Sequence, residues 1–555
     1  MPGLYRLAIV ELFENGDDAG CDVVFCLEKD VPEERKWKRP RVSERSKDDS
    51  AATVGGDCLG LPLPAHLLIL RLASPRFRAQ IARWNVNTSD RAAQEAAASS
   101  SCSAPCRPQL RVPLGSEAEA PFARAAIGYA YTGRVAADSV REVLEVRWQA
   151  SYLEINGCMA ACDELLVGML AAGSSSDVGL VGQAVAAAPV DRPARPVEFM
   201  LCGALLPDPA ADPSFGPVLV AAKEALVRHF GDTLVVLNTP SLRQQLLQLP
   251  AIVVEALLGS DSFGTDSEDT VLLLLATWMK ANHSQTDAAT RERLCRLVRL
   301  VQLGRPYLTA VLPALAADHE TREGSSHCAW FPISVTEASF IAALATASAG
   351  MEKQQFLSHG RRVYDMQSAW YSTARRPQCL SGAGRGCEWA VSQQELLQKL
   401  GELKPGITKR LHGSFPNGSP CARGFEFKTF LEVAYAAAAA RLDLWCCMPA
   451  AYDMPGSRLG SGGKAAAVVG LDLCLTVHHW SGSVRQDAFK GEFEAAVPEL
   501  LARPSGHLSG VGWASALPLG QPQPAAGVGG EALVGWAAYV REGRLTGTLT
   551  LLPPP

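Results

Sequence analysis

The first candidate for a chemical role is a glycine-rich stretch that precedes a lysine, RLGSGGKA at 458–465. Backbone N–H groups of such a stretch can cradle a phosphate group. A P-loop requires a glycine five residues before the glycine of its Gly-Lys pair, and a hydroxyl side chain directly after the lysine. Arg458 and Ala465 occupy those two positions. The spacing therefore predicts a surface loop and argues against a nucleotide site.

Histidines and cysteines are the other candidates for chemistry. His478 and His479 are adjacent in an alternating apolar segment, and neighbouring side chains of a strand point to opposite faces, so they cannot easily share one metal ion. Cys158 and Cys162 share a helix face, for which buried thiols are the favoured interpretation and structural zinc the weaker one. The sequence contains no Gly-x-Ser-x-Gly or His-Glu-x-x-His motif. We expect no catalytic residue, no metal ion and no cofactor, and hence not an enzyme.

Length and composition limit the class of protein. The chain has 555 residues, too many for one core, with 48% hydrophobic and 20% charged residues, which is typical of globular domains. The net charge of -5 argues against general nucleic-acid binding. Arg6 and Glu11 interrupt the N-terminal apolar run, which argues against a signal peptide. The longest apolar runs, such as TVLLLLATWM, are too short to cross a membrane. We expect a location in the cytoplasm, the nucleus or both.

A basic peptide bears on that location. Lys38, Arg39 and Arg41 form a cluster of the kind that serves as a nuclear-import signal. Glu33 and Glu34 precede it, so a solvated charged loop is the alternative.

Composition shifts divide the chain into several segments. Two polar stretches interrupt the N-terminal region, two loose segments have linker composition, the middle is helical in pattern, and the C-terminal part alternates. The expected divisions are a first domain at 1–170 with disordered insertions at 29–60 and 83–109, a linker at 171–196, a helical domain at 197–345, a linker at 346–385 and a β-sandwich at 386–555.

Local signals define the elements of the first domain. CDVVFCL predicts a strand by its β-branched residues, and QLRVPL is predicted as a further strand. LPLPAHLLIL predicts a short strand that leads into a helix. Ser74 and Pro75 have the types of an N-cap and a first helical residue, so one helix ends there and another begins. Gly133 closes a helix over PFARAAIGYAYT, and Asp138 or Ser139 caps the next one.

In this order, these motifs resemble the BTB/POZ domain, an α/β fold that forms homodimers. The resemblance covers residues 1–170 and depends on DVVF at 22–25, Ala-His at 65–66, Ser-Pro-Arg-Phe at 74–77, YAYTG at 129–133 and Cys162 in the final helix. It implies that Asp22 and His66 lie near the dimer interface and that Phe77 belongs to the helical core.

The middle region resembles the BACK domain, an all-helical array that commonly follows BTB. The motif LPAIVVEALLGSDSF leads into Ser267-Glu268 and an apolar helix that ends in Trp278. Thr265 and Glu268 have capping-box spacing, and the acidic residues at 266, 268 and 269 favour a helix N-terminus.

Short alternating segments between Gly/Pro turns predict an antiparallel β-sandwich at the C-terminus, as in VVGLDLCLTVHHW, ARLDLWCCM, EALVGWAAYV and RLTGTLTLL. The whole order resembles plant-type BTB–BACK proteins whose last domain is similar to a MATH/TRAF or PHR sandwich. We therefore expect a multidomain α+β protein.

The resemblance implies a substrate adaptor of a cullin-3 ubiquitin ligase, which dimerises through BTB and recruits a protein substrate through the sandwich. Phe77, Ile81 and Tyr131 are the candidates to face cullin-3. Cullin-binding members usually carry an apolar-x-Glu motif after this helix, whereas Arg83 follows Ile81 at that spacing here. The alternative is a dimeric scaffold or transcriptional co-regulator without ligase function.

Overall fold

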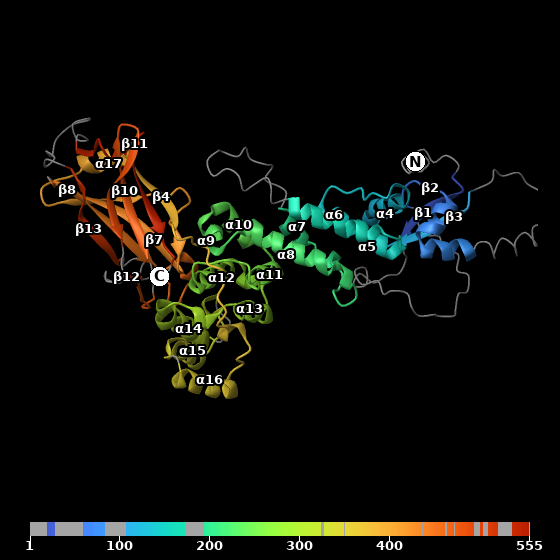
Figure 1. The fold of residues 1–555 in the computed structure, drawn as a ribbon, viewed down its shortest axis with the longest axis horizontal. Coiled ribbons are helices and arrows are strands. Elements are labelled where there is room, and N and C mark those ends of the chain that lie inside the picture. Colours follow the sequence, from blue (N-terminus) through green and yellow to red (C-terminus); the bar gives the residue numbers. More distant parts are fainter. Residues whose placement is uncertain are drawn as a thin grey trace, which may run out of the picture. The chain divides into compact units, whose positions relative to one another are not determined.

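In the computed structural model, the chain folds into two compact units (Figure 1). Unit 1 is Met1–His229 and unit 2 is Phe230–Pro555. The described residues are 19–27, 59–83, 107–172, 194–322, 327–348, 350–435, 437–460, 463–470, 472–492, 500–502, 509–519 and 535–553. The import candidates Lys38, Arg39 and Arg41, most of both insertions and most of the first linker lie outside these ranges. No helix within them is both long and apolar enough to span a bilayer.

Unit 1 contains a three-stranded sheet. Strand β1 (Cys21–Leu27) lies in the middle, antiparallel to β2 (Leu63–Ala65) and parallel to β3 (Gln109–Leu114). All three strands lie in segments that the sequence predicted as strands. Val23 and Phe25 of β1 are buried against the helices that follow.

Helices complete unit 1, and their ends follow the predicted caps. They are α2 (Leu67–Ala73), a helix at 75–83, α4 (Ala120–Thr132), α5 (Val140–Leu153) and α6 (Cys158–Ala172). The Ser74 hydroxyl accepts a hydrogen bond from the Phe77 N–H (3.1 Å) and donates one to the Leu153 carbonyl (2.7 Å). Gly133 ends α4 with φ 60°, and Ser139 forms a capping box with Glu142. The interpretation of Ser-Pro as a break between helices is confirmed.

The next helices, α7 (Arg195–Leu201) and most of α8 (Gly216–Phe230), belong to unit 1 and not to the following helical domain. Phe199 and Phe215 share the core of unit 1. Arg147 of α5 donates to Asp163 (2.5 Å) and Asp212 (2.8 Å), and its guanidinium lies 4.4 Å from the centre of the Phe215 ring. The boundary predicted at 197 was wrong, because these long-range contacts attach the segment to the first domain.

Unit 2 begins with a helical array. Its helices are α9 (Thr233–Asn238), α10 (Pro240–Gln248), α11 (Ala251–Leu258), α12 (Glu268–Asn282), α13 (Ala288–Cys295), α14 (Leu312–Arg322), α15 (Val335–Thr346) and α16 (Met351–Val363). Helix α12 is central, since its residues 268–276 are all buried. Trp278, named above in the apolar segment, is buried, and its indole N–H donates to the Leu249 carbonyl at 2.9 Å.

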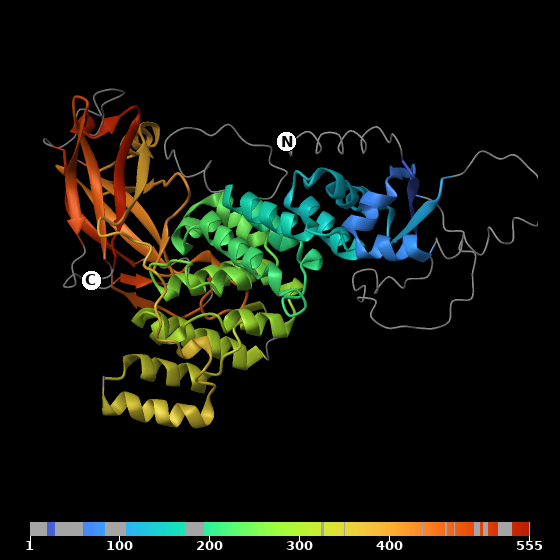
Figure 2. The ribbon, with the colours of Figure 1, turned by 45° about the vertical axis from the view of Figure 1, so that its right-hand side comes forward.

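The segment 346–385, expected to be a linker, is folded. Helix α16 packs beside α15 at one end of the array (Figures 1 and 2). Farther along, Trp370 is fully buried and its indole N–H donates to the Cys295 carbonyl at 2.8 Å. The polar composition of α16 reflects a surface helix, which the sequence pattern did not distinguish from a linker.

Two antiparallel sheets of five strands form the C-terminal part of unit 2. One contains β4 (Arg385–Ser392), β10 (Leu473–Ser481), β11 (Val484–Glu492), β14 (Val540–Arg541) and β15 (Arg544–Leu551); the other contains β5 (Thr408–Gly413), β6 (Cys421–Ala422), β7 (Phe425–Ala434), β8 (Ala439–Cys447) and β13 (Ser509–Pro518). Short strands β9 (Ala467–Val469) and β12 (Leu500–Ala502) pair separately. Phe489 and Trp513 bridge the two sheets with ring centres 5.3 Å apart.

Two details of this part differ from expectation. EALVGWAAYV was predicted as a strand, but within the described residues only Val540 and the following Arg541 are extended, while Trp536 lies buried in a turn. Helix α17 (Gln393–Gly401) was not predicted, although Ser392 caps it by accepting from the Glu395 N–H.

Candidate functional site: association surfaces and the junction of unit 2

Asp22 and His66 are the candidates for the dimer interface: Asp22 lies on β1, and His66 directly follows the paired strand β2. Asp22 pairs in register with Pro64, two residues before His66, and its carboxylate lies 3.9 Å from Arg107. The backbone N–H of His66 donates to the Tyr131 hydroxyl at 2.9 Å, and the two rings meet edge to face. Burial raises the pKa of Tyr131 to about 12, so the phenol that accepts from the His66 N–H stays protonated at neutral pH.

The three residues expected to face cullin-3 are core residues. Phe77 is 0% exposed, Ile81 7% and Tyr131 4%, and all three belong to the core of unit 1. The expectation that Phe77 belongs to the core agrees with this burial. The prediction that these three side chains contact cullin-3 is corrected, because buried side chains offer no surface to a partner.

Helix α2 carries two exposed apolar side chains. Leu68 and Leu72 are one turn apart and are 69% and 64% exposed, whereas Leu70 between them is buried. We call Leu68 and Leu72 the α2 apolar pair. Sequence reasoning missed the pair although LLILRLA is apolar around the helix, a pattern that leaves some leucines facing outward.

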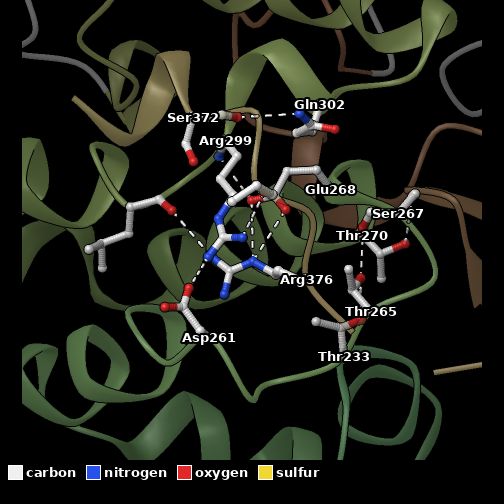
Figure 3. Close-up of polar contacts among 12 residues, drawn as sticks. Thr233, Asp261, Thr265, Ser267, Glu268, Thr270, Arg299, Gln302, Ser372 and Arg376 are labelled. Carbon is white, nitrogen blue, oxygen red and sulfur yellow. Dashed lines mark hydrogen bonds and ion pairs between the residues drawn. The ribbon is translucent and has the colours of Figure 1, made fainter. Parts of the chain in front are cut away.

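In unit 2, the start of α12 is a junction between the helices and the sheets. The buried carboxylate of Glu268 is 3.2 Å from the Arg376 guanidinium, which is also buried (Figure 3). Glu268 also accepts from the Arg299 N–H at 2.9 Å, while the Arg299 side chain donates to the Ala374 carbonyl (2.8 Å) and to Asp261. Burial raises the pKa of Glu268, and the two arginines counteract that rise.

These contacts correct the predicted capping box. Ser267 is the N-cap, and the Thr265 hydroxyl donates to the Ser267 carbonyl at 2.7 Å. The Glu268 side chain binds Arg376, which is 108 residues away in the sequence. The spacing had suggested instead that it binds the backbone near Thr265.

The neighbouring carboxylates bind backbone from the loops and strands. Asp266 accepts from the Arg423 N–H at 2.6 Å, and Asp269 accepts from the Gly304 N–H at 2.8 Å. Thr270 accepts from the Gly424 N–H at 3.1 Å. Because Arg423 and Gly424 form the turn between β6 and β7, the start of α12 is bonded to the turn of a β-hairpin.

More contacts tie the β-sheets to the helices. Arg385, at the start of β4, donates twice to Asp232, at 3.0 and 2.8 Å. The Tyr307 hydroxyl donates to the Gly424 carbonyl at 2.5 Å. Asp318 of α14 accepts from Ser457 (2.9 Å) and from the Arg458 N–H, which anchors the beginning of the glycine-rich loop. The carboxylates at the junction therefore have structural partners.

Part of the helical array is similar to a known domain family. Residues 234–313 match the BACK family, BTB And C-terminal Kelch. The matched residues run from α9 into α14 and contain the whole of α12. No curated protein matches the chain.

A cleft of about 300 Å³ lies between the BACK helices and the sheets. Its lining is mainly apolar with three charged residues, and comprises Leu237, Arg243, Leu247, Leu273, Thr277, Lys280, Ala281, Cys421, Glu426, Pro449, Ala450 and Ala451. Polar contacts brace two of its walls. Asn238 exchanges two hydrogen bonds with the Cys421 backbone (2.6 and 2.9 Å), and Lys280 donates to the carbonyls of Ala450 (2.6 Å) and Asp453 (3.0 Å).

The histidine pair has a structural explanation on its buried side. His478 lies on β10, and its two ring nitrogens are 2.9 and 3.0 Å from the hydroxyls of Thr546 and Thr548 on β15. Burial lowers the pKa of His478, so the neutral ring is favoured. These two contacts occupy both nitrogens that a metal ion would need.

Proposed function

We propose that the protein is a dimeric substrate adaptor of a cullin-3 ubiquitin ligase. The observation that supports this proposal most is the match of residues 234–313 to the BACK family. In the chain, these residues follow a unit of strands and helices in the order that we expected for a BTB domain. The proposed arrangement has unit 1 pair with a second copy and bind cullin-3, while the β-sheets hold a protein substrate. The protein needs no chemistry of its own, since tethering a substrate beside a loaded enzyme raises its effective concentration.

The junction of unit 2 supports this proposal. An adaptor must hold its substrate at a fixed distance and angle, and buried ion pairs depend strongly on geometry. The buried ion pair of Glu268 with Arg376 holds the segment before β4 against the start of α12. Asp266 accepts from the Arg423 backbone N–H and so fastens the turn before β7 to the same helix start. We further propose that the two sheets form a sandwich of the MATH/TRAF or PHR type.

The alternative is a dimeric scaffold or transcriptional co-regulator that uses the same folds. Two observations favour it: Arg83 replaces the acid of the cullin-binding motif, and Lys38, Arg39 and Arg41 resemble an import signal. Either protein would act in the cytoplasm, in the nucleus or in both.

Affinity capture separates the two functions. The full-length tagged protein should recover cullin-3 from cells together with a substrate that accumulates when ubiquitin transfer is blocked. The same tagged protein is localised by microscopy, with the tag alone as the control. Recovery of partners without cullin-3, from a nuclear pool of folded protein, would support the co-regulator and contradict the adaptor.

A further inference from the structure

The cleft between the BACK helices and the β-sheets has the construction of a binding site. Its volume of about 300 Å³ is at the small end of the range for ligand sites, about 300 to 1,000 Å³. Leu237 and Leu273 are buried beneath it, and Cys421 and Pro449 form apolar walls. Such a lining accepts one bulky aliphatic or aromatic side chain.

The walls are already held in place. Asn238 of α9 binds both backbone groups of Cys421, and Lys280 of α12 binds two carbonyls near η10 (Ala450–Tyr452). Preformed walls avoid the entropic cost of ordering loops around a ligand, which favours binding of small groups.

The charges around the cleft favour an anion. The lining contains two cations, Arg243 and Lys280, and one carboxylate, Glu426. The Glu426 carboxylate is already paired with the Lys428 ammonium at 3.5 Å. The Lys280 ammonium contacts two carbonyl oxygens, and among the described residues no carboxylate forms an ion pair with it. The Arg243 guanidinium has no hydrogen-bond or ion-pair partner within the part of the chain that the structure describes. A partly exposed guanidinium beside an apolar floor is suited to a carboxylate, with two parallel hydrogen bonds.

We infer that this cleft binds the C-terminal residue of a protein or peptide that ends in a bulky apolar amino acid. In such a residue the carboxylate and the apolar side chain share one α-carbon, so the two groups stay close enough for a small cleft. The side chain enters between Leu273 and Cys421, and the carboxylate pairs with Arg243. This inference names a substrate class for the proposed adaptor and takes its biological meaning from that function.

Fluorescence anisotropy with purified full-length protein tests the inference. The probe is a fluorescein-labelled Gly-Ser-Gly-Ser-Gly-Leu peptide with a free carboxylate, and it is compared with its C-terminal amide and with a version that ends in Ser. The free acid should bind saturably, and both other peptides should bind at least about tenfold more weakly, since each loses one of the two contacts.

Variants locate the binding. Arg243→Gln should weaken the free acid about tenfold and leave the amide unchanged, whereas Ala281→Trp, at an exposed lining position, should block both peptides. Arg305→Gln is the matched control, because Arg305 is an exposed arginine of the array outside the cleft lining. Circular dichroism and thermal melting verify that each variant is folded.

Two results would overturn the inference: no saturable binding of the free acid at about 1 mM peptide, or binding that neither Arg243→Gln nor Ala281→Trp changes. Binding of an internal Leu-Glu sequence as tightly as the free C-terminus would also contradict it. A failure here leaves the capture of cullin-3 intact, and a failure of that capture leaves the peptide result intact, so the two proposals fail separately.

Discussion

Three carboxylates within four residues are buried at the start of α12. Asp266, Glu268 and Asp269 all have pKa values raised by burial, because removing a carboxylate from water disfavours its charged form. Glu268 has the Arg376 guanidinium as a counterion, whereas Asp269 has the Gly304 N–H. The difference makes Asp269 the residue at which the junction is most sensitive to pH.

Burial raises the pKa of Asp269 from 3.8 to about 8. The unfolded chain releases this proton near pH 4 while the folded protein keeps it, so this residue's contribution to stability is complete below about pH 4. The contribution falls as the pH rises towards 8 and changes no further above that value. Asp269→Asn keeps an oxygen that can accept from Gly304 and removes the charge. Unfolding followed at pH 5, 6, 7 and 8 should therefore depend less on pH in the variant, with a melting temperature higher by a few degrees at pH 8.

Asp365→Asn is the matched control for this experiment. Asp365 is exposed, and its carboxylate accepts from the Gln367 N–H, which an amide oxygen can also do. Its pH profile should follow that of the wild type. An Asp269→Asn profile as steep as that of the wild type would mean that the carboxyl group is not buried in its neutral form.

At the scale of elements, the turn before β7 lies against Tyr307 of the helical array at Gly424. This residue has φ 76°, and a Cβ placed on it would lie 2.3 Å from the Tyr307 hydroxyl. Gly406 has nearly the same φ, 77°, but a Cβ there would have no neighbour within 4 Å. The two glycines therefore separate backbone strain from the contact between the helices and the sheet.

Gly406→Ala should lower the free energy of unfolding by about 1 kcal/mol, the cost of a left-handed alanine. Gly424→Ala should lower it by roughly 2 kcal/mol more, because Tyr307 must move and the helices then separate from β7. Denaturant unfolding of both variants checks the difference. Equal losses at the two sites would show that Tyr307 does not constrain this strand.

Elements with local signals were predictable from sequence. The break at Ser74, the end of α4 at Gly133 and the cap at Ser139 depend on neighbours within a few residues, and all three were confirmed. Helix α17 carried such a signal, Ser392-x-x-Glu395, which went unnoticed. Arg376 lies in a stretch of linker composition, and its ion pair with Glu268, 108 residues away, is a contact that local sequence signals do not indicate.

The same limit applied to the candidate sites. The family motifs led to Phe77 and Tyr131 but could not separate their side chains from the surface, since exposure depends on the packing of α2, α4 and the sheet together. The cleft gathers residues from α9, α10, α12, β6 and β7, which have no common sequence pattern. Its discovery required the three-dimensional arrangement of unit 2.

For the whole molecule, we propose that unit 1 associates with partners and unit 2 recognises the substrate. Each unit has its own core, and the helices at 195–229 extend the first core beyond the predicted domain boundary. The α2 apolar pair, Leu68 and Leu72, is the surface of unit 1 to which we assign contact with a second copy, because exposed leucines one turn apart favour burial in an interface.

Light scattering during size-exclusion chromatography of the full-length protein, alone and with purified cullin-3, tests the central claim most directly. The account predicts a particle of twice the chain mass of 59.1 kDa alone, and a larger complex of two chains with two cullin-3 molecules in the mixture. Leu68→Asp combined with Leu72→Asp should give the single-chain mass, whereas Ile252→Asp, at an equally exposed site on α11, should remain dimeric. A folded wild-type protein that elutes as a monomer and apart from cullin-3 would contradict the account.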